Sequence, residues 1–564
     1  MARVSARLLL ATIAFCLVAL LVGRDHPLQN LNEGIYARVA QEMLERGDFV
    51  VPTLDGVPYL EKPPLLYWVT AAGYAILGTH EAAVRLAPLF GTVLTLAATA
   101  WFARRHLGIR STYFAVTIVT SMPIVLVLGR TLLFDMLFTG LLFASFVALY
   151  ETLTRPAEAR WLRWSYALLA GAILAKGLAA LVFYLLVVAA AVLPTGPAAR
   201  LTIARRLADP LAVAILLALA VPWHVVVGVR HPDFVWFYFV NEHLLRFFDA
   251  RVPHDYHTGA WWYFLPRIPL DIFPWTLLLL LPNKRAVLTP EVASARRFLW
   301  IALLVPLVVY SLSIAKGEYY LVVGAAPLAL LAADRLVRAR AVERRNALVA
   351  IALSFAVVIA VLASVSSTQI APYAMPGARM AVLVTVGAAV IVALLAAFRR
   401  RPALAVLACA AASLPCIAFY SEFFRVNEPL KSALSLAFEL NRAPAPVYVY
   451  REFESLSALP FYLDAPVGVV DSRSTELWYG SRLEPQPERF PDTVAMRKLA
   501  ASEPLWLVVP MAESARFANS GLETTFVAER AVGSNELYAS QPLADELARE
   551  RALRSVARAG GAAR

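Results

Sequence analysis

The sequence predicts a mainly helical protein that crosses a membrane many times and ends in a small α/β domain. Of its 564 residues, 60% are hydrophobic and only 16% are charged, and the mean hydropathy is +0.64. A soluble domain of this size keeps more charge at its surface. The apolar residues fall in blocks of roughly 16–22 residues, about the length at which a helix crosses ~30 Å of hydrocarbon. In the last quarter of the chain the pattern changes to short runs of strand length.

About 13 apolar blocks qualify as transmembrane spans by the ~20-residue criterion. The first block could instead be a signal peptide, but no small-x-small cleavage site follows it, so we expect a retained helix. Only Lys176 and Gly177 divide the long apolar stretch around 162–194. The predicted spans are 8–23, 82–103, 112–128, 134–150, 162–175, 178–194, 210–228, 264–281, 298–313, 319–333, 347–364, 380–398 and 403–420.

Basic residues predict the orientation of these spans, because Lys and Arg in short loops mark the cytoplasmic side. With the N-terminus inside, every cytoplasmic connection contains several basic residues, and the alternate loops are mixed or acidic. We therefore expect a multi-pass inner-membrane protein with long periplasmic loops at 24–81 and 229–263. The net charge of +12 does not indicate nucleic-acid binding, since the arginines lie in short clusters between apolar blocks.

The chain divides into a predicted transmembrane domain, residues 1–420, and a predicted periplasmic α/β domain, residues 421–564. The first loop has an amphipathic pattern at Tyr36–Leu44, typical of a helix in the membrane interface, and a turn at Asp55-Gly56. In the second domain, β-branched runs alternate with helical stretches. The predicted strands are Val447–Tyr450, Gly468–Val470, Leu505–Val509 and Thr525–Val527, and the helical stretches lie near 430–441, 493–502 and 511–520. After about residue 545 we expect a solvated helix or a disordered tail.

Ionisable residues gather on the predicted outer side. Charged groups at membrane depth are energetically costly and are functional candidates by default. They are Glu33, Glu61 and Lys62 in the first loop; Glu242, His243 and Arg246 in the second; Arg130 and Asp135 at one helix end; and Lys176, Lys316 and Glu318 at two others. Structural alternatives stay open for each group: Arg130 and Asp135 could form only an ion pair, the two lysines could extend to the interface, and Glu242-His243 could be ordinary loop residues.

The order of short motifs along the chain is that of a known enzyme family. The first loop contains Asn32-Glu33-Gly34-Ile35-Tyr36-Ala37 near its start and Glu61-Lys62-Pro63-Pro64-Leu65-Leu66-Tyr67-Trp68 near its end. Further motifs are Leu133-Phe134-Asp135, Ala175-Lys176-Gly177, Val221-Pro222-Trp223, Glu242-His243 with Arg246-Phe247, Ser313-Ile314-Ala315-Lys316-Gly317, Phe461-Tyr462-Leu463 and Glu476-Leu477-Trp478-Tyr479-Gly480. Together they resemble the aminoarabinose transferases that modify lipid A. Those belong to the protein O-mannosyltransferase superfamily, which are integral-membrane glycosyltransferases of the GT-C fold.

The resemblance implies a sugar donor of the polyprenyl-phosphate type and inversion at the anomeric carbon. It also implies site residues. Glu61 and His243 match positions near a metal ion, and Tyr59 and Lys62 match positions near the donor phosphate. Asp135 matches the second of two family acids.

At the first acid position the family usually has Asp, but this chain has Asn32. An amide cannot accept a proton as a carboxylate does. Three explanations stay open. Glu33 acts as the base in place of residue 32, Asp135 acts as the base, or no strong base is needed because an acceptor phosphate is already ionised. Ile35 also stands where the family has Arg, and this change is expected to alter recognition of a phosphate or of the acceptor.

Departure of a lipid phosphate from a sugar calls for nearby cations. The candidates are Lys62, Arg130, Arg246 and Lys316. A divalent metal on Glu61 and His243 could share this work. A carboxylate and an imidazole favour Zn or Mn as the metal. Because two protein ligands are too few, the sugar donor or a water molecule would have to complete the coordination.

The expected function is therefore transfer of a sugar from undecaprenyl phosphate to a cell-envelope acceptor, such as lipid A or a related lipid phosphate. The alternative is transfer of a hexose or mannose to protein or to an envelope glycan. A lipid-linked transporter is disfavoured because we find no internal repeat, and an inactive relative is suggested only by Asn32. We expect a monomer that contacts membrane lipids.

Overall fold

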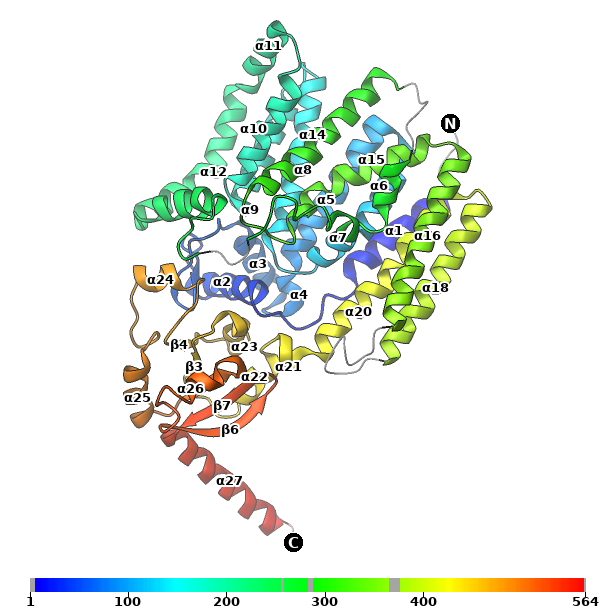
Figure 1. The fold of residues 1–564 in the computed structure, drawn as a ribbon. Coiled ribbons are helices and arrows are strands. Elements are labelled where there is room, and N and C mark those ends of the chain that lie inside the picture. Colours follow the sequence, from blue (N-terminus) through cyan, green and yellow to red (C-terminus); the bar gives the residue numbers. More distant parts are fainter. Residues whose placement is uncertain (1–5, 255–257, 282–287, 365–375, 562–564) are drawn as a thin grey trace. The chain divides into compact units, whose positions relative to one another are not determined.

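The computed structural model describes residues 6–254, 258–281, 288–364 and 376–561 (Figure 1). The chain forms two compact units. The first comprises residues 1–25 and 61–423, and the second comprises residues 26–60 and 424–564. The sequence analysis assigned the whole loop 24–81 to the transmembrane domain. The structure differs, because residues 26–60 belong to the same unit as the C-terminal residues.

The first unit is a bundle of apolar helices, which confirms a multi-pass, mainly helical chain. Among the described residues, seven helices are long and apolar enough to cross a membrane: Glu81–Leu107, Phe134–Thr154, Pro210–Arg230, Pro290–Leu312, Tyr320–Arg338, Gly377–Phe398 and Pro402–Val426. Three shorter apolar helices are Arg7–Leu21, Leu65–Leu77 and Ala179–Val192.

Most of the predicted spans coincide with helices. These helices are α1 (Ala6–Leu21), α5 (Leu86–Phe102), α8 (Phe134–Thr154), α9 (Arg160–Lys176), α10 (Ala179–Val192), α12 (Pro210–Arg230), α14 (Pro290–Leu312), α15 (Ala325–Arg338), α16 (Ala341–Ser364) and α18 (Pro376–Phe398). Two predicted spans are interrupted. Span 112–128 is divided between α6 (Ile109–Ser121) and α7 (Pro123–Leu128), and span 403–420 between α19 (Pro402–Ala411) and α20 (Ser413–Val426).

The predicted span 264–281 is not a continuous helix. It contains only the short helix α13 (Ile268–Asp271) and the 3₁₀-helix η3 (Trp275–Leu280). Three prolines, at 266, 269 and 274, explain the difference, because each removes a backbone donor and disfavours helix at the preceding residue. Conversely, α3 (Leu65–Leu77) and α11 (Pro197–Leu207) are helices that lie in predicted loops.

Helix α8 is the most buried of the membrane-length helices. Two glycines let it approach α5 closely: a Cβ atom added to Gly140 would lie 2.4 Å from the carbonyl oxygen of Gly91, and one added to Gly91 would lie 2.4 Å from that of Met136. This close packing fixes the N-terminal end of α8, where Asp135 lies in the first turn.

The second unit contains a five-stranded mixed sheet in the order β4-β3-β5-β7-β6. The parallel strands β3 (Val447–Tyr450), β4 (Gly468–Val470) and β5 (Trp506–Pro510) match three predicted strands, and β6 (Phe526–Val532) extends the fourth. The antiparallel strand β7 (Asn535–Ser540) was not predicted. Helices α22 (Leu434–Leu440) and α25 (Thr493–Ser502) match predicted stretches, and α27 (Gln541–Gly561) makes the tail helical.

The segment 26–60 forms helix α2 (Asn32–Arg46) and the hairpin of β1 (Thr53–Leu54) and β2 (Val57–Pro58). The predicted turn is confirmed, since Asp55 and Gly56 connect the strands with φ values of 52° and 78°. Helix α2 is buried continuously from Glu33 to Met43. The prediction of an interfacial helix at Tyr36–Leu44 is therefore wrong, because such a helix would expose its polar face.

Candidate active site

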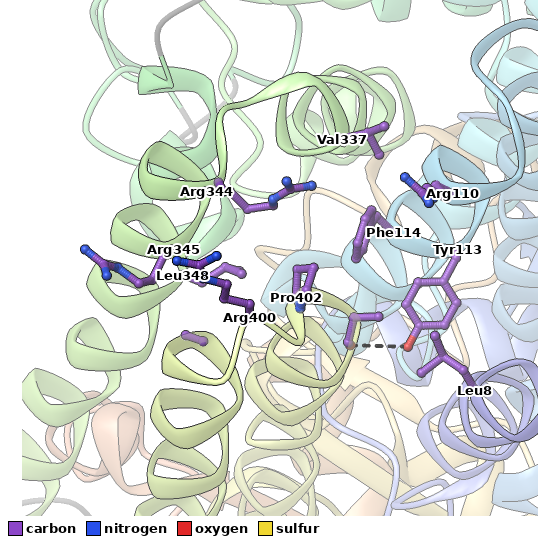
Figure 2. Close-up of a pocket in the computed structure, with 13 residues that line it drawn as sticks. Leu8, Arg110, Tyr113, Phe114, Val337, Arg344, Arg345, Leu348, Arg400 and Pro402 are labelled. Atoms are coloured by element: carbon purple, nitrogen blue, oxygen red, sulfur yellow. Dashed lines mark hydrogen bonds between the residues drawn. The ribbon is translucent and has the colours of Figure 1, made fainter. Parts of the chain in front are cut away.

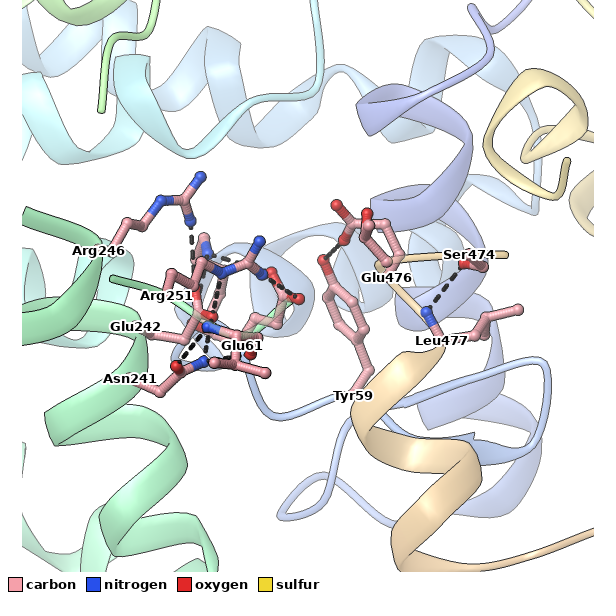
Figure 3. A network of polar contacts seen from close by, with 12 residues as sticks. Tyr59, Glu61, Asn241, Glu242, Arg246, Arg251, Ser474, Glu476 and Leu477 are labelled. Atoms are coloured by element: carbon pink, nitrogen blue, oxygen red, sulfur yellow. Dashed lines mark hydrogen bonds and ion pairs between the residues drawn. The ribbon is translucent and has the colours of Figure 1, made fainter. Parts of the chain in front are cut away.

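A buried cluster of charged side chains forms the centre of the candidate site in the first unit. Arg251 bridges two carboxylates: its Nη2 donates to Oε1 of Glu61 at 2.8 Å, and its Nε donates to Oε1 of Glu242 at 2.5 Å (Figure 3). All three side chains are less than 10% exposed. A bridge of this kind satisfies both acids and fixes their positions.

Lys62 and Arg246 lie on the more open side of the same cluster. The Nζ atom of Lys62 is 3.5 Å from Oε2 of Glu61 and 3.7 Å from Oε2 of Glu242, and Nη1 of Arg246 donates to that Glu242 oxygen at 3.1 Å. Their side chains are 19% and 25% exposed, against 5% for Arg251. Three cations thus face two carboxylates, and the two accessible cations carry the excess positive charge.

The local sequence explains why these residues meet. Pro63 and Pro64 follow Lys62 directly and precede α3, so the Glu61-Lys62 pair is held on a stiff approach to a helix. On the other side, the amide of Asn241 forms two hydrogen bonds of 2.8 Å with the backbone of Val252, one as donor and one as acceptor. This clamp closes the loop after η2 (Val235–Leu245) and brings Arg251 back to Glu242.

The electrostatics of the cluster favour its charged form. Burial alone would raise the pKa of Glu242, but the charges of Lys62, Arg251 and Arg246 outweigh it and lower the pKa below its ordinary value. Burial would likewise lower the pKa of Arg251, but Glu61 and Glu242 raise it. Both side chains therefore stay ionised near neutral pH.

His243 lies next to this cluster but is held by backbone atoms. Its Nδ1 is 2.6 Å from the carbonyl oxygen of Tyr238, and its Nε2 is 3.2 Å from the backbone nitrogen of Leu178. Nδ1 therefore donates and Nε2 accepts, which is the neutral tautomer. Burial, with a contribution from Lys62 and Arg246, lowers the pKa of His243 to about 4.

Gly177 makes this histidine contact possible. Its φ is +92°, and a Cβ atom there would lie 2.4 Å from Nε2 of His243. Only glycine adopts this backbone conformation without strain and leaves room for the ring. The contact with His243 therefore explains why the Ala175-Lys176-Gly177 motif ends in glycine.

Asp135 and Lys176 form an ion pair between Oδ1 and Nζ, and both are largely shielded from solvent. Asp135 lies at the N-terminus of α8 and Lys176 at the C-terminus of α9, where the helix dipoles favour each charge. The Nζ atom of Lys176 is also 4.4 Å from the ring centre of Tyr320, which stacks on Tyr310. Lys176 is within electrostatic range of Arg246, so the pair adjoins the cluster around Glu242.

The described residues fit a metal ion poorly at Glu61 and His243. Both ring nitrogens of His243 are engaged with the backbone, and Glu61 is paired with Arg251. No group of three or more His, Cys, Asp or Glu side chains able to hold a metal occurs in the described part of the chain. The Zn or Mn ion stays a prediction, and no chemical step below depends on it.

Arg130 and Lys316 have structural partners that do not favour phosphate binding. The guanidinium of Arg130 donates to the carbonyl oxygens of Val22 at 2.7 Å and Leu126 at 2.6 Å, and also to Ala19. The ammonium of Lys316 donates to three carbonyls at the end of α14, those of Tyr310, Ser311 and Ser313. Each cation therefore caps a helix end. The suggested Arg130–Asp135 pair is replaced by the pair of Asp135 with Lys176.

The remaining candidates, Asn32, Glu33 and Tyr59, lie in the second unit. Oε2 of Glu33 accepts from the backbone nitrogen of Gln29 at 3.0 Å, and Oδ1 of Asn32 accepts from the hydroxyl of Tyr36 at 3.0 Å.

The hydroxyl of Tyr59 donates to Oε2 of Glu476 at 2.5 Å (Figure 3). Glu476 belongs to the C-terminal motif that the sequence had singled out. This contact gives that motif a role in the structure, since it ties the segment 26–60 to the C-terminal part of the same unit.

Sequence reasoning missed Arg251, Asn241 and Tyr320. Arg251 follows an aromatic loop with no pattern around it, and its position depends on a fold-back that the hydrogen bonds of Asn241 hold. Tyr320 lies in a Tyr-Tyr pair that resembles any interfacial aromatic pair. A signal was available only for Arg251, since buried acids at 61 and 242 require a buried cation.

Comparison with known proteins agrees with these motifs. Residues 28–239 match the family model described as dolichyl-phosphate-mannose-protein mannosyltransferase. The chain is 34% identical over 333 residues to the undecaprenyl phosphate-alpha-4-amino-4-deoxy-L-arabinose arabinosyl transferase of Yersinia enterocolitica, covering 57% of this chain and 58% of that relative. The protein of the same description from Pectobacterium carotovorum is 32% identical over 328 residues, covering 57% of each. The matched region thus spans somewhat more than half the length of these relatives.

A solved structure is similar over nearly the whole chain. The crystal structure of ArnT from Cupriavidus metallidurans bound to undecaprenyl phosphate superposes with a TM-score of 0.79 at 25% sequence identity. The match covers 95% of this chain and 98% of that one. The apo form of the same protein gives a TM-score of 0.77.

Proposed function

We propose that this chain is an ArnT-like glycosyltransferase of the PMT family, and that it transfers a sugar from a polyprenyl-phosphate donor to an acceptor in the cell envelope. The observation that carries the proposal is the pair of accessible cations, Lys62 and Arg246, held on buried carboxylates. Such a pair suits a phosphate that must leave with negative charge. The relatives named for an undecaprenyl-phosphate sugar donor support the same donor class.

In the proposed reaction, an acceptor oxygen attacks the anomeric carbon from the face opposite the lipid phosphate. The bond between that carbon and the phosphate oxygen breaks, and its electron pair leaves with the phosphate, so the configuration inverts. Lys62 and Arg246 stabilise the departing charge. Arg251 bridges Glu61 and Glu242 from the buried side, so three cations face two carboxylates and the cluster keeps a net positive charge that attracts phosphate.

Asp135 is the acid we assign to the acceptor side. The ion pair with Lys176 holds its carboxylate in place, which suits a group that orients an acceptor or takes up its proton. Glu33 is a weaker candidate, because one of its oxygens already accepts from the backbone of Gln29. With Asn32 at the first acid position, a phosphate acceptor fits best, since it is ionised near pH 7 and needs no strong base.

The acceptor is accordingly lipid A or a related lipid phosphate, and the sugar is of the aminoarabinose type or a close analogue. Ile35, in place of the family's Arg, leaves mannosyl or hexosyl transfer to protein or glycan as the second candidate, which the family model of mannosyltransferases favours. Mass spectra of lipid A from a deletion strain separate the two. Loss of a sugar on a lipid A phosphate supports the first, and an unchanged pattern removes lipid A as acceptor.

We also propose about 13 spans, with the N-terminus in the cytoplasm and both the site and the sheet unit in the periplasm. The basic connections between spans support this orientation. Labelling of single cysteines with a membrane-impermeant reagent tests it: a cysteine at position 498 should react in intact spheroplasts, and one at position 200 should react only after lysis. The reverse pattern would invert the orientation.

A further inference from the structure

A pocket lined by arginines lies in the first unit, and none of its lining residues belongs to the candidate active site. It has a volume of about 450 Å³ and is formed where α1, α6, α15, α16, α18 and α19 begin or end (Figure 2). Its lining residues are Leu8, Arg110, Tyr113, Phe114, Val337, Ala341, Arg344, Arg345, Leu348, Ala397, Arg400, Pro402 and Ala403. None of these residues is acidic.

The arginines reach the pocket from three separate elements. Arg110 lies in the first turn of α6, Arg344 and Arg345 near the start of α16, and Arg400 directly after α18. Arg400 has a left-handed backbone conformation, with φ of 56°, which turns the chain back before α19 begins at Pro402. This turn places Arg400 in the lining of the pocket, whereas a helix that continued past Phe398 would direct the residue elsewhere.

The positive charge of this pocket is not neutralised by the protein. In the described part of the chain, no carboxylate forms an ion pair with Arg110, Arg344 or Arg400. The charged neighbour that acts on Arg344 is Arg110, and their interaction is repulsive. Converging arginines without an acid are stabilised by an anion from outside.

The surroundings of the pocket indicate a lipid as the source of that anion. Phe398, two residues before Arg400, is 62% exposed, and Leu9, next to Leu8, is 51% exposed, as expected for side chains that face hydrocarbon. Tyr113 also lines an apolar groove of about 1030 Å³ along α1, α5 and α6. The change from exposed apolar to basic residues within one helix turn is typical of the level of lipid headgroups.

We infer that this pocket binds the phosphodiester headgroup of an anionic membrane phospholipid, such as phosphatidylglycerol. The guanidiniums of Arg110, Arg344 and Arg400 bind the phosphate oxygens, and Leu8, Phe114 and Leu348 contact the glycerol and the first methylenes. The site is separate from the proposed transferase site, so loss of one need not abolish the other.

Native mass spectrometry of the purified full-length protein tests this inference. The protein is presented with phosphatidylglycerol or with phosphatidylcholine of the same chain lengths, and lipid adducts are counted. We expect a preference for phosphatidylglycerol, reduced about fivefold by Arg344→Gln or Arg110→Gln. Arg344→Lys, which keeps the charge, should retain most of the preference. Arg399→Gln is the matched control, because it removes the same charge from an exposed residue outside the pocket lining, and it should change the preference less than twofold.

Three results would overturn the inference: no preference in the unmodified protein, an equal effect of Arg344→Gln and Arg399→Gln, or thermal stabilisation by millimolar inorganic phosphate equal to that by phosphatidylglycerol. The last would mean that a soluble phosphate is the ligand. The comparison of lipids in the unmodified protein remains decisive even if a variant fails to fold.

Discussion

Lys62 and Arg246 show how single residues carry the proposed chemistry. Each is a partly exposed cation paired with a buried carboxylate, Glu242, whose other oxygen is taken by Arg251. The carboxylate cannot move toward the open side, so both cations keep a fixed position and a net attraction for anions. Preorganised charge of this kind stabilises a leaving phosphate without reorganisation during the reaction.

Neutralising either cation should therefore slow transfer strongly. We expect Lys62→Gln and Arg246→Gln each to lower kcat/KM by about 10²–10³-fold, the usual effect of removing one such group. Lys498→Gln, the same change at an exposed residue of the sheet unit, should leave the rate unchanged. Full activity in either site variant would remove the phosphate-binding role from that residue.

The two acids can be distinguished by their partners. Asp135→Asn removes the charge paired with Lys176 and should lower kcat by about 10²–10⁴-fold. Glu33→Gln keeps a carbonyl oxygen that can accept from Gln29 and should cost less than about tenfold. Steady-state rates of both variants decide between them. Activity retained in both would refute the assignment of either acid.

At the scale of elements, the junction between α9 and α10 depends on one glycine. We expect Gly177→Ala to destabilise the protein by about 1–3 kcal/mol, because φ of +92° is strained for alanine and the new Cβ would collide with His243. Gly196→Ala is the matched control, since its φ is −69° and no atom lies within 4 Å of a Cβ there. Thermal unfolding in detergent compares the two; equal midpoints would contradict the argument.

The β1–β2 turn in the second unit contains a buried acid that should make stability depend on pH. Burial, with a contribution from Glu42, raises the pKa of Asp55 to about 8, against the opposing effects of Arg38, Arg489 and the backbone nitrogen of Val467. Oδ2 of Asp55 is buried and has no hydrogen-bond partner among the described residues, which fits a protonated acid.

Between about pH 4 and pH 8 the folded state therefore binds a proton that the unfolded state has lost, so stability falls as pH rises through this window. Asp55→Asn should flatten the decrease of the unfolding midpoint between pH 6 and pH 8. Asp492→Asn, at an exposed helix cap, should not alter that slope. A wild-type midpoint that rises over this range would have the wrong sign.

For the whole molecule, period and length in the sequence were enough to predict most of the helices and most of the strands. The apolar blocks matched helices because membrane length and composition are strong local constraints. Prediction failed where local and tertiary signals disagree. The span 264–281 was broken by its prolines, and α2 was buried on all sides because residues 26–60 fold with a C-terminal unit far away in sequence.

The candidate site was likewise predictable from the sequence only in part. Glu61, Lys62, Asp135 and His243 could be proposed from the sequence because they lie in motifs, and their roles stay predictions. Arg251 was missed because its role arises from a contact across 190 positions of sequence. The backbone partners of Arg130 and Lys316 could not be predicted, because the sequence shows a cation but not the carbonyl groups that it contacts.

The central claim is that this chain transfers a sugar from a lipid phosphate with Lys62 and Arg246 at the leaving group. The most direct measurement is turnover by the purified full-length protein of a panel of undecaprenyl-phosphate sugars with extracted envelope lipids, beside Lys62→Gln and Arg246→Gln. The account predicts release of undecaprenyl phosphate with at least one donor and acceptor pair, and a loss of about 10²–10³-fold in each variant. Equal turnover in the unmodified protein and in both variants would contradict it.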